Sequence, residues 1–332
     1  MVEALSVALI VLTYQGKPFL QRLLPSLLNQ TYSNYHIVIV DNASTDGTID
    51  YITDTIGSKA EIVANVSNLG CAAGYNIGAA ACPNDDILCF LNQDIVLAPD
   101  YCKAIVSRFT IELDAVAVQP MVQYLDNPDL IENCGHTADV WLNTRPVGHL
   151  LPAGSFDVPM GLLFTLTAPA IRRAWFEFLG GFDESLFIYY EDTDLSLRIW
   201  EAGGRVVFEQ QAIVQHLQEG SASQFPDEWR SFLWARNRLQ LLWKHSRRPD
   251  EYARAALFTG GAFTLVPLLV LLRPQVGIAV ARGLAVALTR CAVNRHKPMK
   301  RVPSDTLTVL RRAGVLRPSD GIPSVLRRAL KP

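Results

Sequence analysis

Apolar runs of strand length alternate with helical patterns through the first 110 residues of the chain. The runs are "LSVALIVL" (5–12), "HIVIVD" (36–41), "EIVAN" (61–65) and "DILCFL" (86–91). Helical patterns follow at about 17–30, after "STDGT", at about 73–82 and after Pro99. Strands that are apolar on both faces and alternate with helices are typical of a parallel sheet covered on both sides. The pattern therefore predicts a doubly wound α/β fold, whose ligand site lies beyond the carboxyl ends of the strands.

The second half of the chain has a different pattern. We expect a strand at "VPMGLLFTL" (158–166) and a helix at "APAIRRAWFEFLGGF" (168–182). A further helix begins at the acidic residues near 191 and ends at the glycine pair 203–204. A strand through "RVVFE" and "AIVQH" and an aromatic-rich helix over 228–245 complete this half.

Polar side chains collect where the first four predicted strands end. They are Thr13, Tyr14 and Gln15 after the first strand, Asp41, Asn42 and Ser44 after the second, Asn65, Ser67 and Asn68 after the third, and Asn92, Gln93 and Asp94 after the fourth. The carboxyl ends of parallel strands meet at one edge of a sheet, so these groups are expected to converge on one ligand site.

Two acidic features of the chain have both a chemical and a structural interpretation. Asp94 follows a buried strand, where a carboxylate is costly unless a positive charge such as Mg²⁺ or Mn²⁺ offsets it. Alternatively, Asp94 caps a turn. The stretch "IYYEDTDLSLRIW" (188–200) places Glu191, Asp192 and Asp194 beside apolar residues. They form either a solvated first helical turn that complements the helix dipole, or a catalytic base at the edge of a pocket. Asp194 is also spaced to pair with Arg198.

Composition and charge exclude several classes of protein. The chain has 332 residues, of which 49% are apolar and 19% charged, and this excludes a disordered chain. The six cysteines form no CxxC pair, which favours a reducing compartment over a zinc or disulfide framework. The apolar start of the chain has no basic residue before it, so we interpret it as a buried first strand and not as a signal peptide.

The tail of the chain differs in charge from the body. Residues 273–332 carry 13 Lys and Arg against two acidic residues, whereas residues 1–272 carry 17 basic and 30 acidic ones. Residues 255–272 are uncharged, which is near the lower limit for a membrane span. We expect the basic, apolar tail to bind the anionic cytoplasmic face of the cell membrane. A transmembrane hairpin and a soluble helical domain are the alternatives, and no motif supports a nucleic-acid partner.

Several blocks occur in a characteristic order, namely "VLTYQ", "IVIVDNASTDGT", "NLGCAAGYNIG", "FLNQDI", "GGFDESLFIYYEDTDLSLR" and "VQH". This ordered set, over about residues 5–245, resembles the family 2 glycosyltransferases of the GT-A fold, and in particular the bacterial rhamnosyltransferase-type branch. The resemblance implies a GT-A domain over 1–245, with a nucleotide-binding half (1–120) and an acceptor and catalytic half (121–245). Residues 246–332 would form the membrane-associating helical tail.

The resemblance also implies roles for individual residues. Asp41 and Thr13 would contact a uracil or thymine base. Asp94 would hold Mg²⁺ or Mn²⁺ on the donor diphosphate, and His216 would complete the metal site. Asn92 and Gln93 depart from the usual DxD-like motif, which puts the metal affinity in doubt. The remaining donor contacts would come from Tyr14, Gln15, Asn42, Asn68, Gly70, Asn76 and Asn92.

Asp192 looks like the general base for the acceptor hydroxyl, with Glu191 as the second candidate. One base and one metal suffice for an inverting transfer. The expected activity is transfer of a sugar such as L-rhamnose from a dTDP or UDP donor to a lipid-linked or cell-surface polysaccharide acceptor. The alternative is a non-catalytic nucleotide-sugar or glycan-binding module. Arg236, in "WARNRL" (234–239), either meets a phosphate or lies on a solvated helix face. The regularly spaced glycines Gly70, Gly74 and Gly78 are expected to let the backbone approach the donor.

Overall fold

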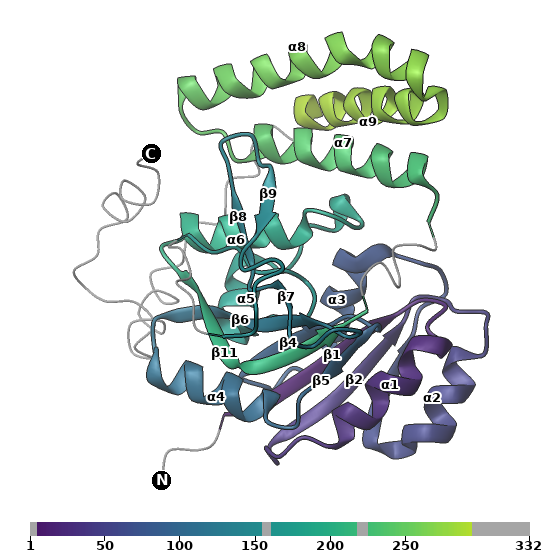
Figure 1. The fold of residues 1–332 in the computed structure, drawn as a ribbon, viewed down its shortest axis with the longest axis vertical. Coiled ribbons are helices and arrows are strands. Elements are labelled where there is room, and N and C mark those ends of the chain that lie inside the picture. The colour runs from purple at the N-terminus through teal and green to yellow at the C-terminus, as the bar shows by residue number, and fades with distance from the viewer. Residues whose placement is uncertain (1–4, 155–160, 218–224, 294–332) are drawn as a thin grey trace.

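The computed structural model describes residues 5–154, 161–217 and 225–293, and within them a nine-stranded sheet forms the centre of the protein (Figure 1). The strands lie in the order β3-β2-β1-β4-β10-β6-β11-β5, and β7 pairs with β6. The first half of the chain supplies β1 (Val7–Thr13), α1 (Lys17–Leu28), β2 (Tyr35–Asp41), α2 (Thr48–Ile56), β3 (Ala60–Ala64), α3 (Gly70–Ala81), β4 (Ile87–Leu91), β5 (Ile95–Leu97) and α4 (Tyr101–Ile111). All strand pairs within β3-β2-β1-β4 are parallel, as the sequence pattern predicted.

The second half of the chain completes the sheet with both strand directions. Its elements are β6 (Ala115–Tyr124), β7 (Ile131–Asn133), β8 (His136–Ala138), β9 (Thr144–Pro146), β10 (Ala170–Arg172), α5 (Arg173–Leu179), α6 (Glu191–Glu201), β11 (Arg205–His216), α7 (Asp227–Lys244), α8 (Pro249–Leu272) and α9 (Pro274–Val293). The long strands β6 and β11 pair in parallel, whereas the short strands β5, β7 and β10 pair antiparallel. The sheet is therefore mostly parallel, with antiparallel insertions on the side of β6 and β11.

Helices cover both faces of the sheet because its central strands are apolar on both sides. Alternate residues of β1, such as Leu9 and Val11, pack with α1, α2 and α4 in one core. The intervening residues, such as Ala8 and Ile10, pack with α3, α5 and α6 in the other. The two helix layers leave the carboxyl ends of β1, β2 and β4 uncovered.

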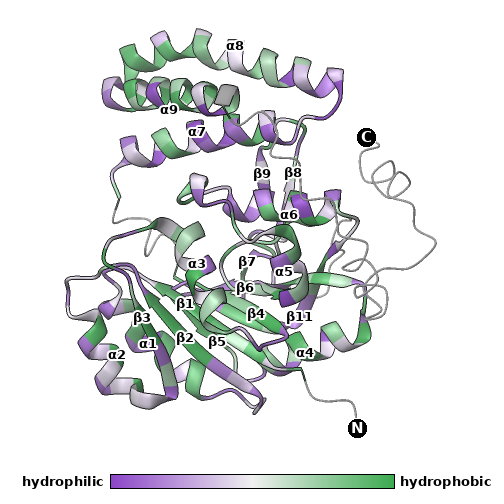
Figure 2. Ribbon diagram, turned by 180° about the vertical axis from the view of Figure 1, so that it is seen from behind, coloured by the Kyte–Doolittle hydropathy of each residue, from purple (hydrophilic) through white to green (hydrophobic). Residues whose placement is uncertain are grey.

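The helices α7, α8 and α9 form a separate layer on the side of α6 and of the β8–β9 hairpin (Figure 1). Buried Leu239 of α7 packs with Leu284 and Ala287 of α9 in the core of this layer. Of the helices that the structure describes, α8 alone is long and apolar enough to cross a membrane, and only 6% of its most apolar stretch is buried. Figure 2 shows hydrophobic residues along much of α8. The domain boundary predicted at 245 falls between α7 and α8 and stays a prediction.

Some predicted elements differ from the observed ones. The strand expected at 158–166 falls partly outside the described residues, and within 161–166 only Leu163 forms a bridge, to His136. The helix expected over 168–182 is instead β10 followed by α5, because Ala170–Arg172 fill the gap between β4 and β6. The strand β5 was not predicted, because its three residues gain their partner, β11, only in the folded chain.

Candidate active site

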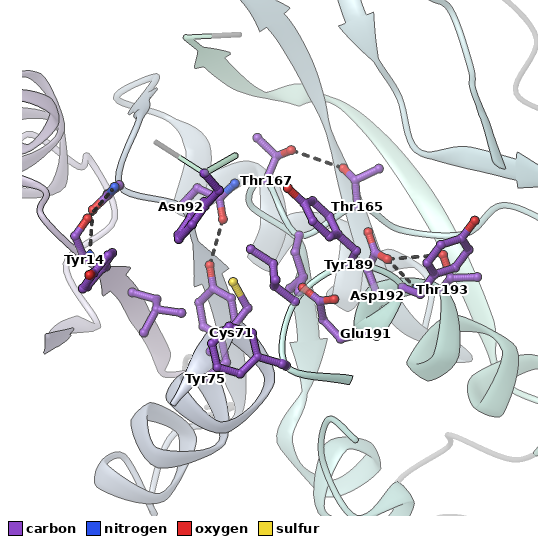
Figure 3. A pocket seen from close by; sticks show the side chains of 18 of the residues that line it. Tyr14, Cys71, Tyr75, Asn92, Thr165, Thr167, Tyr189, Glu191, Asp192 and Thr193 are labelled. Atoms are coloured by element: carbon purple, nitrogen blue, oxygen red, sulfur yellow. Dashed lines mark hydrogen bonds between the residues drawn. The ribbon is translucent and has the colours of Figure 1, made fainter. Parts of the chain in front are cut away.

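A cavity of about 560 Å³ opens where β1, β2 and β4 end, facing the start of α6 (Figure 3). It is lined by residues from both halves of the chain. The predicted site residues among them are Thr13, Tyr14, Asn42, Asn68, Gly70, Asn92, Asp94, Glu191, Asp192 and His216. The predicted residues Gln15, Asp41 and Asn76 are described by the structure but do not line this cavity. The polar clusters at the strand ends therefore converge, as the parallel sheet predicted.

The ends of β1 and β4 are joined by Gln93, one of the polar residues expected at the strand ends, to which no individual role was assigned from sequence. Its Oε1 accepts hydrogen bonds from Oγ1 of Thr13 at 2.7 Å and from the backbone N–H of Tyr14 at 2.9 Å. Its Nε2 donates to the carbonyl oxygen of Tyr14 at 3.2 Å. Gln93 thus fixes the segment that follows β1 and forms one wall of the cavity.

Asp41 lies beside Thr13 at the end of β2, because the two residues are partners in the β1–β2 register. The side chain is fully buried, and its Oδ2 accepts a hydrogen bond from the backbone N–H of Ser44 at 2.8 Å. Its Oδ1 has no hydrogen-bond partner among the described residues. A buried carboxylate oxygen of this kind is costly unless a ligand satisfies it. Asp41 therefore offers a hydrogen-bond acceptor next to the cavity wall.

Amide side chains shape the wall between β2, α3 and β4. Nδ2 of Asn42 donates to the carbonyl of Gly70 at 3.1 Å, and Oδ1 of Asn68 accepts from the N–H of Gly70 at 2.9 Å. Oδ1 of Asn92 accepts from the hydroxyl of Tyr75 at 2.9 Å (Figure 3). These bonds hold the start of α3 against the strand ends, so its backbone approaches the cavity at Gly70.

Two predicted donor contacts have other partners. The amide of Asn76 bonds to the backbone N–H and carbonyl of Phe182 at 2.9 and 3.0 Å, and so connects α3 to the second half of the chain. Nε2 of Gln15 donates to Oγ1 of Thr45 at 3.0 Å, and Oε1 accepts from the N–H of the same residue at 3.2 Å. The donor-binding role of both residues stays a prediction.

Only the first of the three spaced glycines approaches the cavity. A Cβ on Gly74 would lie 2.4 Å from Leu12, and one on Gly78 would lie 2.3 Å from Ile10. These two residues are glycines because α3 packs closely on β1. The expectation that all three glycines admit the donor was therefore wrong for Gly74 and Gly78.

The expected metal ligands, Asp94 and His216, meet because β11 pairs with β5. In that register His216 is opposite Ile95, the residue after Asp94, and Nε2 of His216 lies 3.4 Å from Oδ1 of Asp94. Nδ1 lies 2.8 Å from Oε2 of Glu132 on β7. The two carboxylates raise the pKa of His216 to about 10, although burial opposes this.

This arrangement fits a divalent cation. Asp94 offers the carboxylate oxygen that Mg²⁺ and Mn²⁺ prefer, and His216 offers an imidazole nitrogen that a transition metal such as Mn²⁺ accepts. A cation held by these residues would replace the proton on His216. Glu132 would then orient His216 from behind, as carboxylates do for metal-bound histidines. Glu132 was not predicted, since only the β6–β7 pairing brings it here.

The carboxylates of Glu191 and Asp192 lie at the start of α6, across the cavity from Asn92 and Tyr75 (Figure 3). Burial raises the pKa of Glu191 well above its ordinary value, and the adjacent Asp192 raises it further. Burial also raises the pKa of Asp192, but His136 and hydrogen bonds from Thr193 favour its charged form. Oδ1 of Asp192 accepts from the N–H of Thr193 at 2.6 Å. Of the two acids, Asp192 is the better placed to carry the negative charge, and Glu191 to hold the proton.

Part of the cavity lining is aromatic. Phe225, Trp229 and Trp234 contribute to it, and the Phe225 ring stacks on Trp229 at 4.6 Å between centroids. His136 also lines the cavity. The sequence analysis did not predict these residues as site residues. The only signal was the aromatic richness of "EWRSFLWARNRL" (228–239), which a buried helix would produce equally well.

A second group of possible metal ligands lies outside the cavity. His36, Cys82 and Asp85 have ligand atoms within 4.8 Å of one another. Nδ1 of His36 lies 3.1 Å from Oδ2 of Asp85. Burial raises the pKa of the Cys82 thiol to about 12, so the thiolate that a metal needs is disfavoured. None of the three lines the cavity, and the group has no part in the site at the strand ends.

Comparison with known families agrees with this architecture. The family model described as "Glycosyl transferase family 2" matches residues 8–150, and the one described as "Glycosyl transferase family group 2" matches residues 87–291. The chain belongs to the family 2 glycosyltransferases, and it is a glycosyltransferase by class. The resemblance inferred from the ordered blocks is confirmed.

Curated relatives include two proteins of Mycobacterium tuberculosis. N-acetylglucosaminyl-diphospho-decaprenol L-rhamnosyltransferase is 27% identical over 243 residues, which are 65% of this chain and 78% of that protein. Pre-mycofactocin glycosyltransferase is 28% identical over 203 residues, which are 59% of this chain and 39% of that protein. These similarities support the rhamnosyltransferase-type resemblance.

Solved structures share the fold at low sequence identity. TarS 1–349 of S. aureus in complex with UDP-GlcNAc has a TM-score of 0.57 and 15% identity, covering 87% of this chain and 83% of that chain. The mannosyltransferase PcManGT of Pyrobaculum calidifontis, with GDP-Man and Mn²⁺, has a TM-score of 0.53 and 19% identity, covering 95% of this chain and 87% of that chain. GalNAc-T7 with UDP, GalNAc and Mn²⁺ has a TM-score of 0.55 and 18% identity. The match covers 72% of this chain and about half (51%) of GalNAc-T7. The predicted GT-A fold is confirmed.

Proposed function

We propose that the protein is an inverting, metal-dependent glycosyltransferase that moves L-rhamnose from a dTDP or UDP donor to a lipid-linked or cell-surface polysaccharide acceptor. The observation that carries the proposal is that Asp94 and Asp192, from the two halves of the chain, line one cavity of about 560 Å³. A cavity of this size can hold a nucleotide sugar beside an acceptor hydroxyl.

The strand ends would bind the donor. Oδ1 of Asp41, which has no partner within the described part of the chain, can accept the imide N–H that uracil and thymine share, with Thr13 beside it. Asp94 and His216 would hold Mg²⁺ or Mn²⁺, which would stabilise the charge on the departing nucleoside diphosphate. The Mn²⁺-containing structures of similar fold support a divalent metal.

The start of α6 would supply the base. An acceptor hydroxyl has a pKa far above 7, so it must lose its proton as it attacks the anomeric carbon. Asp192 would take that proton, while Glu191 stays protonated beside it. A covalent intermediate on Cys71 is disfavoured, because burial keeps the pKa of this cavity-lining thiol well above its ordinary value. Direct attack with inversion is the mechanism we infer, because it needs only the one base and the one metal described above.

Three observations support the acceptor and its location. The M. tuberculosis relative is named for L-rhamnosyl transfer to N-acetylglucosaminyl-diphospho-decaprenol, a lipid-linked acceptor. The exposed leucines of α8, such as Leu268 and Leu271, and the basic sequence that follows α9 suit an anionic membrane surface. The cysteines among the described residues are free, as in a reducing compartment. We therefore place the enzyme on the cytoplasmic face of the cell membrane.

The decisive experiment is a screen of UDP-, dTDP- and GDP-sugars for release of the nucleoside diphosphate, with and without Mg²⁺ or Mn²⁺. The expected result is metal-dependent release from dTDP-L-rhamnose, increased by a lipid-linked glycan acceptor. If donors bind in a thermal-shift assay but none is turned over with any acceptor, the chain is a binding module and the proposal is wrong.

A further inference from the structure

The loop that leads into the two carboxylates has an unusual backbone. Three of its non-glycine residues have positive φ angles, namely Phe187 (69°), Tyr189 (71°) and Tyr190 (71°), and Glu191 follows at once. Bulky L-residues adopt this region only at a cost in energy, and such strain persists where surrounding contacts enforce it. The loop 186–190 must therefore be held from outside.

One side chain of α7 makes most of those contacts. Asn237 is fully buried, and its Nδ2 lies within hydrogen-bond distance of three loop carbonyls. The partners are the carbonyl oxygens of Leu186 at 3.0 Å, Ile188 at 2.9 Å and Tyr189 at 2.8 Å. A single amide group thus donates to three loop carbonyls, of which that of Leu186 also accepts from the backbone N–H of Ile188 at 2.9 Å.

Arg236 supports the same amide. Its Nε donates to Oδ1 of Asn237 at 2.8 Å, and its Nη2 donates to the carbonyl of Leu186 at 2.6 Å. The guanidinium is buried and faces the loop, so both earlier interpretations of Arg236, a phosphate contact and a solvated helix face, were wrong. Oδ1 of Asn237 is thereby fixed, which orients Nδ2 toward the loop carbonyls.

The other side of the loop contacts the donor half of the chain. The carbonyl of Phe187 accepts hydrogen bonds from the N–H groups of Cys71 at 2.6 Å and Ala72 at 3.2 Å, in the first turn of α3. Residues 187–190 themselves line the cavity, whereas Asn237 does not. The loop is therefore a bridge between α3 and α7, and its shape sets where Glu191 and Asp192 lie.

We propose that Asn237 is a positioning residue for the transfer reaction. By holding the strained loop 186–190 it places the carboxylate of Asp192 at the cavity without touching the substrate. The inference rests on the proposed function, because it assumes that Asp192 acts as the base. It adds a requirement that the sequence pattern did not reveal, namely that α7 determines the geometry of a site built on α6.

The test uses Asn237→Asp in the full chain, because this change keeps the size of the side chain and removes both amide N–H donors. Transfer kcat should fall by about 10- to 100-fold, since small misplacements of a catalytic group have effects of this order. The KM for the donor should change little, because its proposed contacts lie on the strand ends. Asn237→Ser, which keeps one donor, should be intermediate.

The matched control is Leu239→Ala, two positions further along α7 in the core with α9. This variant should lose thermal stability but keep its kcat per folded molecule. Amide hydrogen exchange over residues 185–195 gives a readout that needs no turnover. Exchange should accelerate in Asn237→Asp and stay near wild type in Leu239→Ala.

The outcomes separate the two proposals. Unchanged exchange over 185–195 in Asn237→Asp, or an unchanged kcat in an active enzyme, would overturn the positioning role and leave the proposed function intact. A loss of kcat in Leu239→Ala equal to that in Asn237→Asp would also overturn it. If the wild-type protein turns over no nucleotide sugar, the proposed function fails, and the role of Asn237 in the transfer reaction fails with it. Accelerated exchange in Asn237→Asp would then support only the contact between Asn237 and the loop.

Discussion

Asp94 and Asp192 face the same cavity although one lies in the turn between β4 and β5, in the first half of the chain, and the other lies at the start of α6, in the second half. In the proposed mechanism, this relationship lets one acid act on the donor diphosphate and the other on the acceptor hydroxyl. Had the two side chains faced separate regions, neither a shared substrate nor direct displacement would be possible. The predictions below test each side of this arrangement.

Asp192→Asn should abolish sugar transfer and leave nucleotide binding intact. The amide cannot take the acceptor proton, and general-base catalysis of this kind contributes about 10²- to 10⁴-fold to the rate. The measurement is nucleoside diphosphate release in parallel with titration of the nucleotide by calorimetry. Retained turnover would remove Asp192 from the mechanism.

Glu191→Gln separates the roles of the adjacent acids. Because Glu191 is inferred to be protonated, the neutral amide is a close substitute for it, and the loss of kcat should be much smaller than in Asp192→Asn. The same assay applies. A loss that is larger for Glu191→Gln would assign the base to Glu191.

The rate of sugar transfer should fall at acidic pH because Asp192 becomes protonated. Burial raises the pKa of Asp192 above its ordinary value of 3.8, and a base is active only when it is deprotonated. The rate should therefore fall as the pH falls through a pKa above 3.8, and be restored as the pH rises. Initial rates at saturating substrate over a series of buffers would locate this acidic limb of the pH profile. A limb that persists unchanged in the residual activity of Asp192→Asn would belong to another group.

The positions of the polar residues at the strand ends were predictable from sequence, because each position depends on the direction of its own strand. A buried parallel strand has a fixed direction, so the polar residues after "HIVIVD" and "DILCFL" must lie at one edge of the sheet. The start of α6 at Glu191 followed from the acidic first turn and the glycines after residue 202. These regularities located the cavity and the ten predicted site residues that line it.

The contacts between distant segments were not predictable in this way. Glu132 reaches His216 only because the short strand β7 pairs with β6, which also pairs with the part of β11 that carries His216. Asn237 looked like any polar residue of an aromatic helix, although it is fully buried against the loop 186–190. Periodicity describes a residue's own element, whereas these roles depend on a partner element that the pattern does not identify.

Removal of the metal should stop turnover, and Asp94→Asn should weaken the response to added Mn²⁺. Glu132→Gln should raise the Mn²⁺ concentration for half-maximal rate by about 10- to 100-fold, as loss of a group that orients a metal ligand commonly does. The matched control is His36→Ala, which alters the other possible ligand group and should leave the Mn²⁺ response unchanged. Full activity of the wild-type enzyme in excess EDTA would contradict the metal site.

Asp194→Asn should destabilise the fold by about 3–5 kcal/mol, the usual cost of removing one partner from a buried ion pair. Burial alone would raise the pKa of Asp194, but Arg198, His245 and Lys244 hold it well below its ordinary value. Nε of Arg198 donates to Oδ2 at 2.8 Å, and Nζ of Lys244 lies 2.7 Å from Oδ1. These contacts join α6 to the end of α7, and their loss removes the carboxylate that the buried guanidinium of Arg198 pairs with.

The pH dependence of this stability has a definite sign. A carboxyl group whose folded-state pKa is lowered contributes stability above its unfolded pKa and loses that contribution as the pH falls toward the folded value. Acidification should therefore narrow the gap in urea-unfolding midpoint between wild type and Asp194→Asn. The control is Asp250→Asn, which removes an exposed carboxylate and should leave the midpoint near wild type at every pH. A gap that widens on acidification would refute the assignment.

Membrane binding should depend on the exposed face of α8. Leu268 and Leu271 are 54% and 78% exposed, and burying a leucine side chain in hydrocarbon contributes about 1.5–3 kcal/mol. The double substitution Leu268→Glu with Leu271→Glu should therefore weaken sedimentation with anionic vesicles by at least about tenfold. The matched control is Ile111→Glu with Leu113→Glu, since these residues are 74% and 54% exposed at the end of α4. If both double variants lose vesicle binding equally, the effect is one of net charge, and α8 does not form the membrane-facing surface.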